Sequence, residues 1–407
     1  MTDALDLSSF RSRAAQRGRP GYWDFPEVQI KWAFEAGLPD PRTFPIDDLV
    51  RISERVLRED ADDALQYGGG AHGSIVYGWE GLRDRLAERT RRVDGREVDR
   101  RGVLLTSGGV QGISLFCQAF LDEGDAVAVE LPTWEAVVGS VQRLGAEPIA
   151  VPVDGDGLRV DLLEKQIEAL RAAGRRLKFV YTIATFHTPT GVCLSLERRR
   201  RLLELARQWD FLVLEDNVYG ELRYSGETLP TLFALDTSER VVKIDSFSKT
   251  VAPALRLGWV TGHPDAIAAL SAVRGDLGVS QWVARVAETF LTEGLYEPHL
   301  DKIRAVYRDK RDVALAALEQ HCAGSLHWNV PDGGYFLWCT LADGIDGREV
   351  MKRAFAEGVV CRPGERFCGD PEPAKSYFRL AFTMVPHEAI EPGIAVLGRA
   401  IAASTRS

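Results

Sequence analysis

Short apolar runs alternate with amphipathic stretches through the middle of the chain. Runs rich in β-branched residues predict strands at residues 102–105, 126–130, 178–184, 211–215, 241–245 and 257–261. Helical spacing predicts helices at residues 110–121 and 195–209. Strands that are apolar on both faces and separated by helices indicate a mostly parallel sheet covered by helices on both faces. We therefore expect a large α/β domain over residues 51–291.

The pattern changes after this domain. One long helix is predicted at residues 297–321, followed by strands at 333–341, 359–362 and 377–384 and by helices at 348–357 and 387–403. This order predicts a smaller α+β domain over residues 292–407. Residues 1–50 are rich in proline, glycine and aromatic residues, and we expect them to form an arm that packs on the small domain and on the pocket.

Composition and charge exclude several classes of protein. The chain has 407 residues, of which 45% are hydrophobic and 27% charged, as is usual for a soluble globular protein. Its net charge of -9 argues against nucleic-acid binding, so we interpret the basic run at residues 198–201 as a solvated helix face. No apolar leader and no membrane-spanning run is present, which predicts a cytoplasmic protein without membrane contact.

The cysteines and histidines do not predict a metal site. The six cysteines are scattered, form no C-x-x-C pair and stand mostly in apolar stretches. The seven histidines also lack the spacing of metal ligands. We expect buried thiols in a reducing compartment, neither a disulfide framework nor a zinc site.

A first chemical cluster follows the apolar run at residues 241–245. It contains Ser246, Ser248 and Lys249, with Arg256 a few positions later. The carboxyl edge of a parallel sheet is where α/β folds bind ligands. Hydroxyls and a guanidinium can hold a phosphate, and a lysine amine of lowered pKa can act as a nucleophile. Taken alone, the cluster is better explained by a surface lysine after a strand.

Other clusters also follow predicted strands. Asp216 and Tyr219 come after the run at residues 211–215, where a buried carboxylate needs a cationic partner. Gly108 and Gly109 open a predicted helix, whose backbone amides can bind an anion. The run at residues 178–184 leads to a Pro-Thr-Gly turn at residues 189–191. Each has a plain alternative: a helix-capping aspartate, a strand-to-helix turn and an ordinary turn, respectively.

Together the clusters describe one site. A phosphate cup, an amine nucleophile, a carboxylate and a phenol at one sheet edge are what pyridoxal 5'-phosphate (PLP) requires. The amine would form an imine with the cofactor, the carboxylate would hold the ring nitrogen protonated, and the phenol would bond the ring oxygen. No other cofactor is needed to explain these residues.

At this point the chain resembles a known family. It is similar to the fold-type I PLP enzymes of the class I/II aminotransferases, especially the branch with 2-aminoadipate aminotransferases and the C-terminal domains of MocR-type regulators. This resemblance implies a mostly parallel sheet of the seven-stranded type with helices on both faces, plus a smaller α+β domain. The resemblance runs from about residue 36 to the C-terminus and rests on Ser-x-Ser-Lys at 246–249 with the later Arg256. Further matches are Glu-Asp-x-x-Tyr-Gly at 215–220, Gly-Gly-x-Phe at 333–336, Pro-Gly-x-x-Phe at 363–367 and Phe-Arg-Leu at 378–380.

The resemblance implies roles around the cofactor. Lys249 would be the Schiff-base lysine, reacting through an aldimine, and also the base that moves the α-proton. Asp216 would pair with the pyridine nitrogen and Tyr219 with the ring oxygen, while Trp134 would stack on the ring. The phosphate would be held by Ser246, Ser248, Arg256 and the turn formed by Gly108, Gly109 and Val110.

The resemblance also implies how substrate and partner are bound. Arg379 would clamp the α-carboxylate of an amino acid, and Gly37 would line the substrate pocket. Tyr67 matches a tyrosine that reaches the phosphate of the partner subunit, which implies a homodimer with shared sites. We also expect the aromatic residues of the arm, Tyr22, Trp23 and Phe25, to take part in side-chain recognition.

The chain departs from the family pattern at three places. Thr188 stands where the family has an asparagine that donates to the ring oxygen, so Tyr219 would be the main donor. Gly109 and Val110 replace two side chains that donate to the phosphate, and the glycine-rich segment 68–77 is longer than usual. We expect the segment to border the active site, beside Tyr67.

These departures leave more than one function open. The first is an aminotransferase that moves the amino group of an α-amino acid to a 2-oxo acid. The alternative is elimination, replacement or carbon–carbon bond formation at Cβ or Cγ in a specialised pathway, with a larger second substrate. A non-catalytic PLP-sensing regulator is a remote third, because only about 35 residues precede Gly37 and a winged helix needs more.

Overall fold

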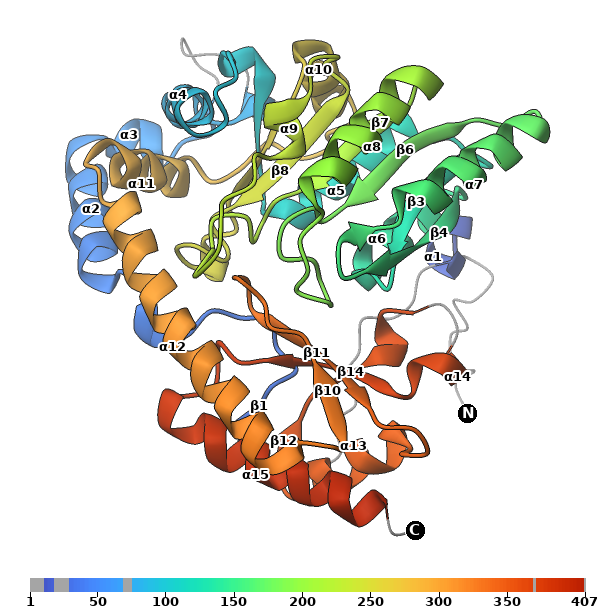
Figure 1. The fold of residues 1–407 in the computed structure, drawn as a ribbon. Helices are drawn as coiled ribbons and strands as arrows, with labels where there is room; N and C mark the ends of the chain where they lie inside the picture. Colours follow the sequence, from blue (N-terminus) through green and yellow to red (C-terminus); the bar gives the residue numbers. More distant parts are fainter. Residues whose placement is uncertain (1–10, 18–28, 69–74, 369–370, 406–407) are drawn as a thin grey trace, which may run out of the picture.

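A large twisted sheet fills the upper part of the molecule in Figure 1. The structure, a computed structural model, describes residues 11–17, 29–68, 75–368 and 371–405. Within these residues the sheet has eight strands in the order β2-β9-β8-β7-β6-β3-β4-β5. They are β2 (Val103–Thr106), β3 (Ala126–Leu131), β4 (Glu147–Asp154), β5 (Gly157–Leu158), β6 (Leu177–Thr182), β7 (Leu212–Asp216), β8 (Val241–Ser246) and β9 (Gly258–Thr261).

The predicted mostly parallel sheet is confirmed, with β9 reversed next to the edge strand β2 and the short β5 reversed at the opposite edge. Strands β4, β3, β6, β7 and β8 pair in parallel, whereas β9 is antiparallel to both β8 and β2. The segment between β8 and β9 holds only the short 3-10 helix η5 (Pro253–Leu255) and is too short for a parallel crossover. The eighth strand, beyond the seven-stranded type expected, is the two-residue β5, which forms a hairpin with β4.

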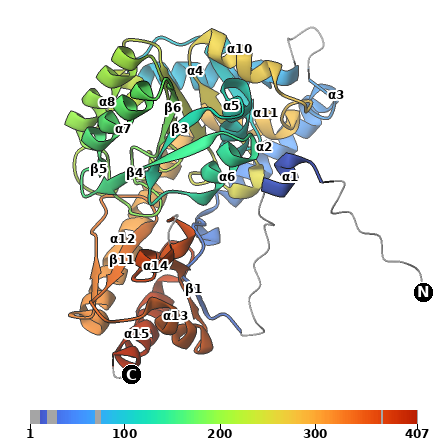
Figure 2. The same cartoon turned by 90° about the vertical axis from the view of Figure 1, so that its right-hand side faces the viewer.

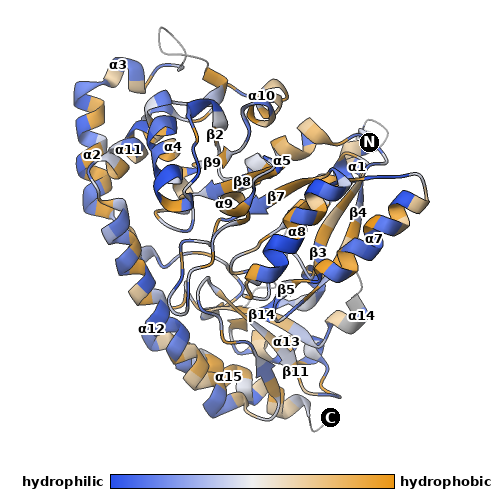
Figure 3. Ribbon diagram, turned by 45° about the horizontal axis from the view of Figure 1, so that its top comes forward, coloured by the Kyte–Doolittle hydropathy of each residue, from blue (hydrophilic) through white to orange (hydrophobic). Residues whose placement is uncertain are grey.

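Helices cover both faces of this sheet, as predicted. Alternate residues of β3 enter opposite cores: Val127 and Val129 pack with one set of helices, and Ala126 and Ala128 with the other. The first set is α5 (Gly109–Phe120), α6 (Glu135–Arg143) and α10 (Pro264–Ala272), and the second is α7 (Val160–Ala172), α8 (Leu196–Trp209) and α9 (Leu232–Leu235). In Figure 3 the strands β3 and β4 are largely orange, whereas α7 and α8 carry much blue.

A group of helices closes the β2 side of the sheet. It consists of α2 (Ile46–Glu59), α3 (Ala61–Ala64), α4 (Glu80–Asp94) and α11 (Gln281–Thr292). The helix α2 begins at Ile46, inside the segment predicted to be an extended arm. The remainder of the described arm holds α1 (Arg13–Arg17), β1 (Trp32–Ala33) and the 3-10 helix η2 (Pro41–Thr43).

A small antiparallel sheet lies below the large one in Figures 1 and 2. Its order is β10-β11-β14-β13, formed by β10 (Leu326–Trp328), β11 (Phe336–Leu341), β14 (Tyr377–Ala381) and β13 (Arg362–Pro363). The long α12 (Tyr296–Cys322), α13 (Gly347–Ala356), α14 (Pro371–Ala374) and α15 (His387–Ser404) accompany it. The strand predicted at residues 359–362 is divided, because β12 (Val359–Val360) leaves this sheet and pairs with β1.

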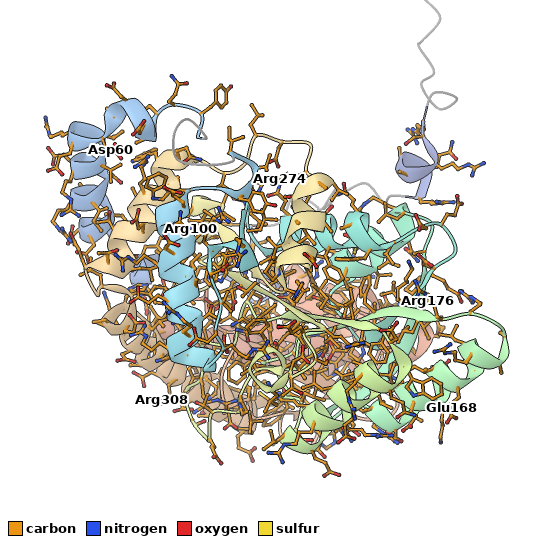
Figure 4. All side chains as sticks on the ribbon, turned by 90° about the horizontal axis from the view of Figure 1, so that it is seen from above. Asp60, Arg100, Glu168, Arg176, Arg274 and Arg308 are labelled. Carbon is orange, nitrogen blue, oxygen red and sulfur yellow. The ribbon has the colours of Figure 1, made fainter. Side chains whose placement is uncertain are left out.

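Charged side chains lie mainly on the outside of the molecule. Glu168, Arg176 and Arg308 are exposed and stand at the rim of the ribbon in Figure 4. Among the described residues, no helix has the length and apolar character needed to cross a membrane. All six cysteines fall within the described residues, and each is a free thiol.

Arg199 is an exception to the expected solvated face of α8. It is 0% exposed, and its guanidinium donates to the carbonyls of Leu194, Pro230 and Ala184 at 2.9, 2.9 and 2.6 Å and to Thr185 Oγ1 at 2.8 Å. The interpretation of residues 198–201 as solvated is therefore wrong at this position. The loop after β6 covers this side of α8 and uses Arg199 as its donor, because its buried carbonyls need partners.

Replacement of Arg199 by alanine should destabilise the protein strongly. The change removes four donor contacts and leaves buried carbonyls unsatisfied, so we expect a loss of about 3 kcal/mol or more in the free energy of unfolding. Urea unfolding followed by circular dichroism measures it. The matched control is Arg200→Ala on the exposed side of the same helix, expected within about 0.5 kcal/mol of the wild type. Equal effects of the two substitutions would contradict the assignment.

Candidate active site

A cavity of about 660 Å³ lies at the carboxyl edge of the large sheet. Ser246 ends β8, Asp216 ends β7, and Thr188 stands in the loop that follows β6. Because these strands are parallel, their ends meet at one edge. The predicted site residues that line the cavity are Gly37, Gly109, Val110, Trp134, Thr188, Asp216, Tyr219, Ser246, Ser248, Lys249, Arg256 and Arg379.

One end of the cavity has the donors of an anion cup. Ser248 N donates to Ser246 Oγ at 3.1 Å, and the two hydroxyl oxygens lie 3.0 Å apart. Arg256 Nη2 donates to the carbonyl of Ser107 at 2.8 Å, which holds the guanidinium beside the first turn of α5. The first amides of a helix have no intrahelical acceptor, so Gly109 and Val110 add backbone donors.

Gly108 is required at this cup for two reasons. Its φ of 87° lies in the left-handed region, which favours glycine. A Cβ at this position would stand 3.0 Å from Arg256 Nη2. Gly108 does not itself line the cavity; it lets the guanidinium approach the start of α5.

Lys249 carries the amine of the site. Its Nζ donates to the carbonyl of Gly37 at 2.7 Å and lies 5.7 Å from the centre of the Tyr219 ring. Burial first, and then the charges of Arg379 and Arg256, lower the pKa of Lys249 to about 8, against a partial opposing effect of Asp216. A lowered amine pKa favours the neutral, nucleophilic form.

Asp216 is a buried carboxylate with a phenol as its partner. Tyr181 Oη donates to Asp216 Oδ2 at 2.7 Å, and Val218 N donates to Oδ1 at 3.4 Å. Burial raises the pKa of Asp216 to about 6, although both hydrogen bonds oppose the increase. A buried carboxylate of this kind is stabilised by a cationic partner. This agrees with the expectation that Asp216 pairs with a protonated ring nitrogen.

Tyr219 and Thr188 supply hydroxyls to the cavity wall. Burial raises the pKa of Tyr219 to about 12, so its phenol stays protonated at neutral pH and can donate. Thr188 Oγ1 is buried close enough to this phenol to lower its pKa slightly, yet it makes no well-formed hydrogen bond with any described residue. The departure at Thr188 therefore places a hydroxyl at the cavity wall, beside the main phenol.

Arg379 comes to the cavity from the small sheet. Its Nη2 donates to the carbonyl of Glu35 at 2.6 Å, and its guanidinium carbon lies 4.1 Å from the centre of the Phe336 ring. The side chain is buried, and its Nε has no hydrogen-bond partner among the described residues. Burial lowers the pKa of Arg379 to about 10, so the guanidinium remains charged at neutral pH.

Gly37 lies where the arm crosses the cavity. A Cβ on this residue would stand 2.8 Å from Phe336 Cζ and 3.6 Å from Tyr219 Oη. The segment therefore needs glycine to come this close to the aromatic wall. Trp134 forms another part of the wall directly before α6, and the neighbouring Thr133 N donates to the carbonyl of Phe367 at 3.0 Å.

Tyr67 does not reach this cavity. Its side chain is 73% exposed, and it does not line the cavity of its own chain. Most of the neighbouring glycine-rich segment, residues 69–74, lies outside the described residues, as do Tyr22, Trp23 and Phe25 of the arm. The expected roles of these residues stay predictions.

Sequence reasoning missed several residues of the site. Tyr181, the partner of Asp216, carried a signal, because it stands one position before the end of β6. Glu35, Arg362 and Phe367 also line the cavity. Phe367 belongs to the Pro-Gly-x-x-Phe motif, to which the sequence assigned no role. The position of Arg362 at the cavity depends on the pairing of β13 with β14, which the sequence does not predict.

The described residues contain no group of three or more histidine, cysteine, aspartate or glutamate side chains that could bind a metal ion. They do fit PLP. The anion cup at Ser246, Ser248 and Arg256 suits a phosphate, and the amine of Lys249 suits an aldehyde. Asp216 suits a protonated ring nitrogen, and the unpartnered Arg379 Nε suits a carboxylate.

The chain is similar to known proteins over almost its whole length. The family model for aminotransferase class I and II matches residues 47–397. Aromatic-amino-acid aminotransferase 1 of Thermococcus litoralis is 38% identical over 90% of this chain and 86% of its own length.

Solved structures extend this comparison to the fold. The multiple substrate aminotransferase of Thermococcus profundus matches with a TM-score of 0.91 and 36% identity, covering 99% of this chain and 100% of that one. The α-aminoadipate aminotransferase LysN of Thermus thermophilus, complexed with N-(5'-phosphopyridoxyl)-L-leucine, matches with a TM-score of 0.88 and 29% identity, covering 99% and 100%.

Lys249 should react with an acylating reagent far faster than an ordinary lysine at neutral pH. With a pKa of about 8, about a tenth of its amine is neutral at pH 7, against roughly one part in 2,500 at the reference value. Competitive labelling with trace acetic anhydride, read by peptide mass spectrometry, measures this in the cofactor-free protein. The labelling should rise as the pH increases through about 8.

The exposed Lys165 is the internal control for this experiment. A Lys249 profile that coincides with that of Lys165 would show that the cavity does not lower the pKa of its amine.

Proposed function

The chain belongs to the class I and II aminotransferases and is a PLP-dependent enzyme, and on this premise we propose the roles of its cavity residues. The amino group of an α-amino acid is transferred to a 2-oxo acid, with Lys249, Asp216 and Tyr219 as the catalytic residues. One observation carries this proposal. The cavity places an amine of lowered pKa, a buried carboxylate and a partly unpartnered guanidinium around one space.

The cofactor supplies an electron sink when it is bound, since its protonated ring stabilises negative charge at the substrate α-carbon. Asp216 holds the proton at the ring nitrogen, and Tyr181 keeps the Asp216 carboxylate in place through its 2.7 Å hydrogen bond. Tyr219 donates to the ring oxygen, because its raised pKa keeps the phenol protonated. Ser246, Ser248 and Arg256 bind the phosphate.

Lys249 and Arg379 act on the substrate. Arg379 binds the α-carboxylate and so orients the α-proton toward the amine, as a planar guanidinium can do with two hydrogen bonds. Lys249 takes that proton and returns it in a later step. A pKa of about 8 suits both transfers, because the amine can then accept and release a proton near neutral pH. The aromatic wall of Trp134, Phe336 and Phe367 excludes water from the reacting atoms.

We also propose that the working form is a homodimer with shared sites, in a cytoplasmic setting. The exposed Tyr67, which cannot contribute to its own cavity in this arrangement, supports a role in the site of a partner subunit. Exposed apolar residues beside it, such as Leu65 at 69%, support a covered surface there.

Amino-group exchange tests the reaction. The holoenzyme is mixed with L-amino acids and with pyruvate or 2-oxoglutarate, and new keto acids and amino acids are measured by mass spectrometry. We expect exchange for at least one pair, together with deuterium incorporation at the α-carbon in D₂O. Lys249→Ala should lower both by at least about 10²-fold, the contribution of a general base.

The two readouts separate the possible outcomes. Deuterium incorporation without amino exchange would contradict transamination and favour chemistry at Cβ or Cγ, whose products the same mass analysis detects. Absence of both, in a protein that binds PLP, would overturn the proposed roles of Lys249 and Arg379.

Hybrid dimers test the shared site. Lys249→Ala and Tyr67→Ala chains with different tags are co-expressed, and the mixed dimer is purified. One of its sites would combine a native Lys249 with a native Tyr67 of the other chain, so roughly half of the wild-type activity should return. The parent homodimers serve as controls, and no recovery in the hybrid would show that Tyr67 does not act across the interface.

A further inference from the structure

A buried pair of titratable side chains stands behind the cavity wall, outside every role assigned so far. Glu130 lies one residue before the end of β3, and His187 lies in the loop that follows β6. They are 2% and 1% exposed, and neither lines the cavity. His187 Nε2 is 3.1 Å from Glu130 Oε2, so an imidazole and a carboxylate meet in the interior.

Glu130 joins the ends of two neighbouring strands, since β3 and β6 pair in parallel. Thr182 Oγ1, at the end of β6, donates to Glu130 Oε1 at 2.6 Å, and Ile183 N donates to Oε2 at 2.9 Å. A buried carboxylate needs such donors because it has lost its hydration. The loop after β6 therefore starts from a point held by Glu130, and its first residue, Ile183, lines the cavity.

His187 extends this support into the turn that follows. Its Nδ1 is 2.8 Å from Thr190 Oγ1. Its backbone N donates to the carbonyl of Val192 at 2.9 Å, and its carbonyl accepts from Gly191 N at 2.6 Å. Its Nε2 makes no well-aligned hydrogen bond, so the link to Glu130 is electrostatic. A carboxylate beside Nε2 favours a proton on that nitrogen, and Nδ1 then accepts from the Thr190 hydroxyl.

Thr188, the next residue, is the one that this support places at the cavity. Its side chain is 3% exposed, and its Oγ1 has no well-formed hydrogen bond with any described residue. Burial raises the pKa of the Tyr219 phenol to about 12, and Thr188 Oγ1 stands close enough to oppose this shift. A buried hydroxyl without a partner is costly, and a ligand atom in the cavity can supply that partner. Because threonine is short, its hydroxyl reaches only as far as the backbone of the loop brings it.

We propose that His187, supported by Glu130, is a positioning residue that holds the Thr188 hydroxyl so that it donates, beside Tyr219, to the ring oxygen of bound PLP. The inference rests on the proposed function and deepens it, since it supplies a second donor at the position where the family has an asparagine. Such a donor stabilises the anionic form of that oxygen. The competing interpretation is that the pair only stabilises the edge formed by β3 and β6, without effect on the cofactor.

The absorbance of bound PLP, titrated with pH in the holoenzyme, separates the two interpretations. Loss of a donor to the ring oxygen favours its protonated form, so the midpoint of the absorbance change should rise. Thr188→Val, which removes the hydroxyl and keeps the shape, should raise the midpoint by at least about half a pH unit. His187→Leu should raise it by a similar amount. The matched control is Thr90→Val, which removes a buried hydroxyl of α4 away from the cavity and should leave the midpoint unchanged.

A double variant assigns the effect to its route. If His187 acts through Thr188, the combination of His187→Leu with Thr188→Val should shift the midpoint no further than Thr188→Val alone. His187→Gln, whose amide can still donate to Glu130, should shift it less than His187→Leu. Glu130 is unsuitable for this cycle because its charge, after the larger effect of burial, also contributes to the raised pKa of Asp216.

The outcomes are distinct. Additive shifts in the double variant would overturn the inference, as would an unchanged midpoint in Thr188→Val or in His187→Leu. Lower stability of His187→Leu in urea with an unchanged midpoint would establish the competing interpretation. Should His187→Leu not fold, His187→Gln takes its place in the cycle under the same criterion. The proposed function fails separately, if the wild type shows no amino exchange while the midpoint shifts and their non-additivity are present.

Discussion

The common edge of the parallel strands is the constraint on which the rest of this molecule depends. Strands β6, β7 and β8 end side by side because they pair in parallel, and their backbone groups beyond the last ladder need new partners. Polar residues at this edge supply those partners and the chemistry together. Asp216 shows the result most clearly, since a phenol from the neighbouring strand end holds its carboxylate in place.

Positive charge is concentrated at this edge, although the chain as a whole is negatively charged. The sequence as a whole has a net charge of -9, yet Lys249, Arg256, Arg362 and Arg379 all face one cavity. Burial shifts the pKa values of this cavity in opposite directions, lowering that of the Lys249 amine to about 8 and raising that of the Asp216 carboxyl to about 6. An anionic cofactor and a carboxylate substrate fit such a site because they restore the charge balance.

The arm and the small sheet supply the remaining groups of the cavity wall. The backbone carbonyls of Glu35 and Gly37 accept hydrogen bonds from Arg379 and Lys249, so one short segment contacts the cations of both sheets. Gly37 is close to the Phe336 ring, which leaves no room for a Cβ. The cavity wall thus depends on residues far apart in the chain that are joined by single hydrogen bonds.

The sequence by itself determined the α/β class, six of the eight strands that the described residues form in the large sheet, and Lys249, Asp216 and Arg256 as site candidates, because each follows a recognisable apolar run. It did not predict β4 or β5. It could not determine that β9 is antiparallel, that Arg199 is buried or that Arg362 faces the cavity. Local patterns report which residues are apolar, whereas these outcomes depend on strand pairing and on which loop covers a helix. Only the tertiary structure decided them, since the pairing of β13 with β14 joins residues that no periodicity connects.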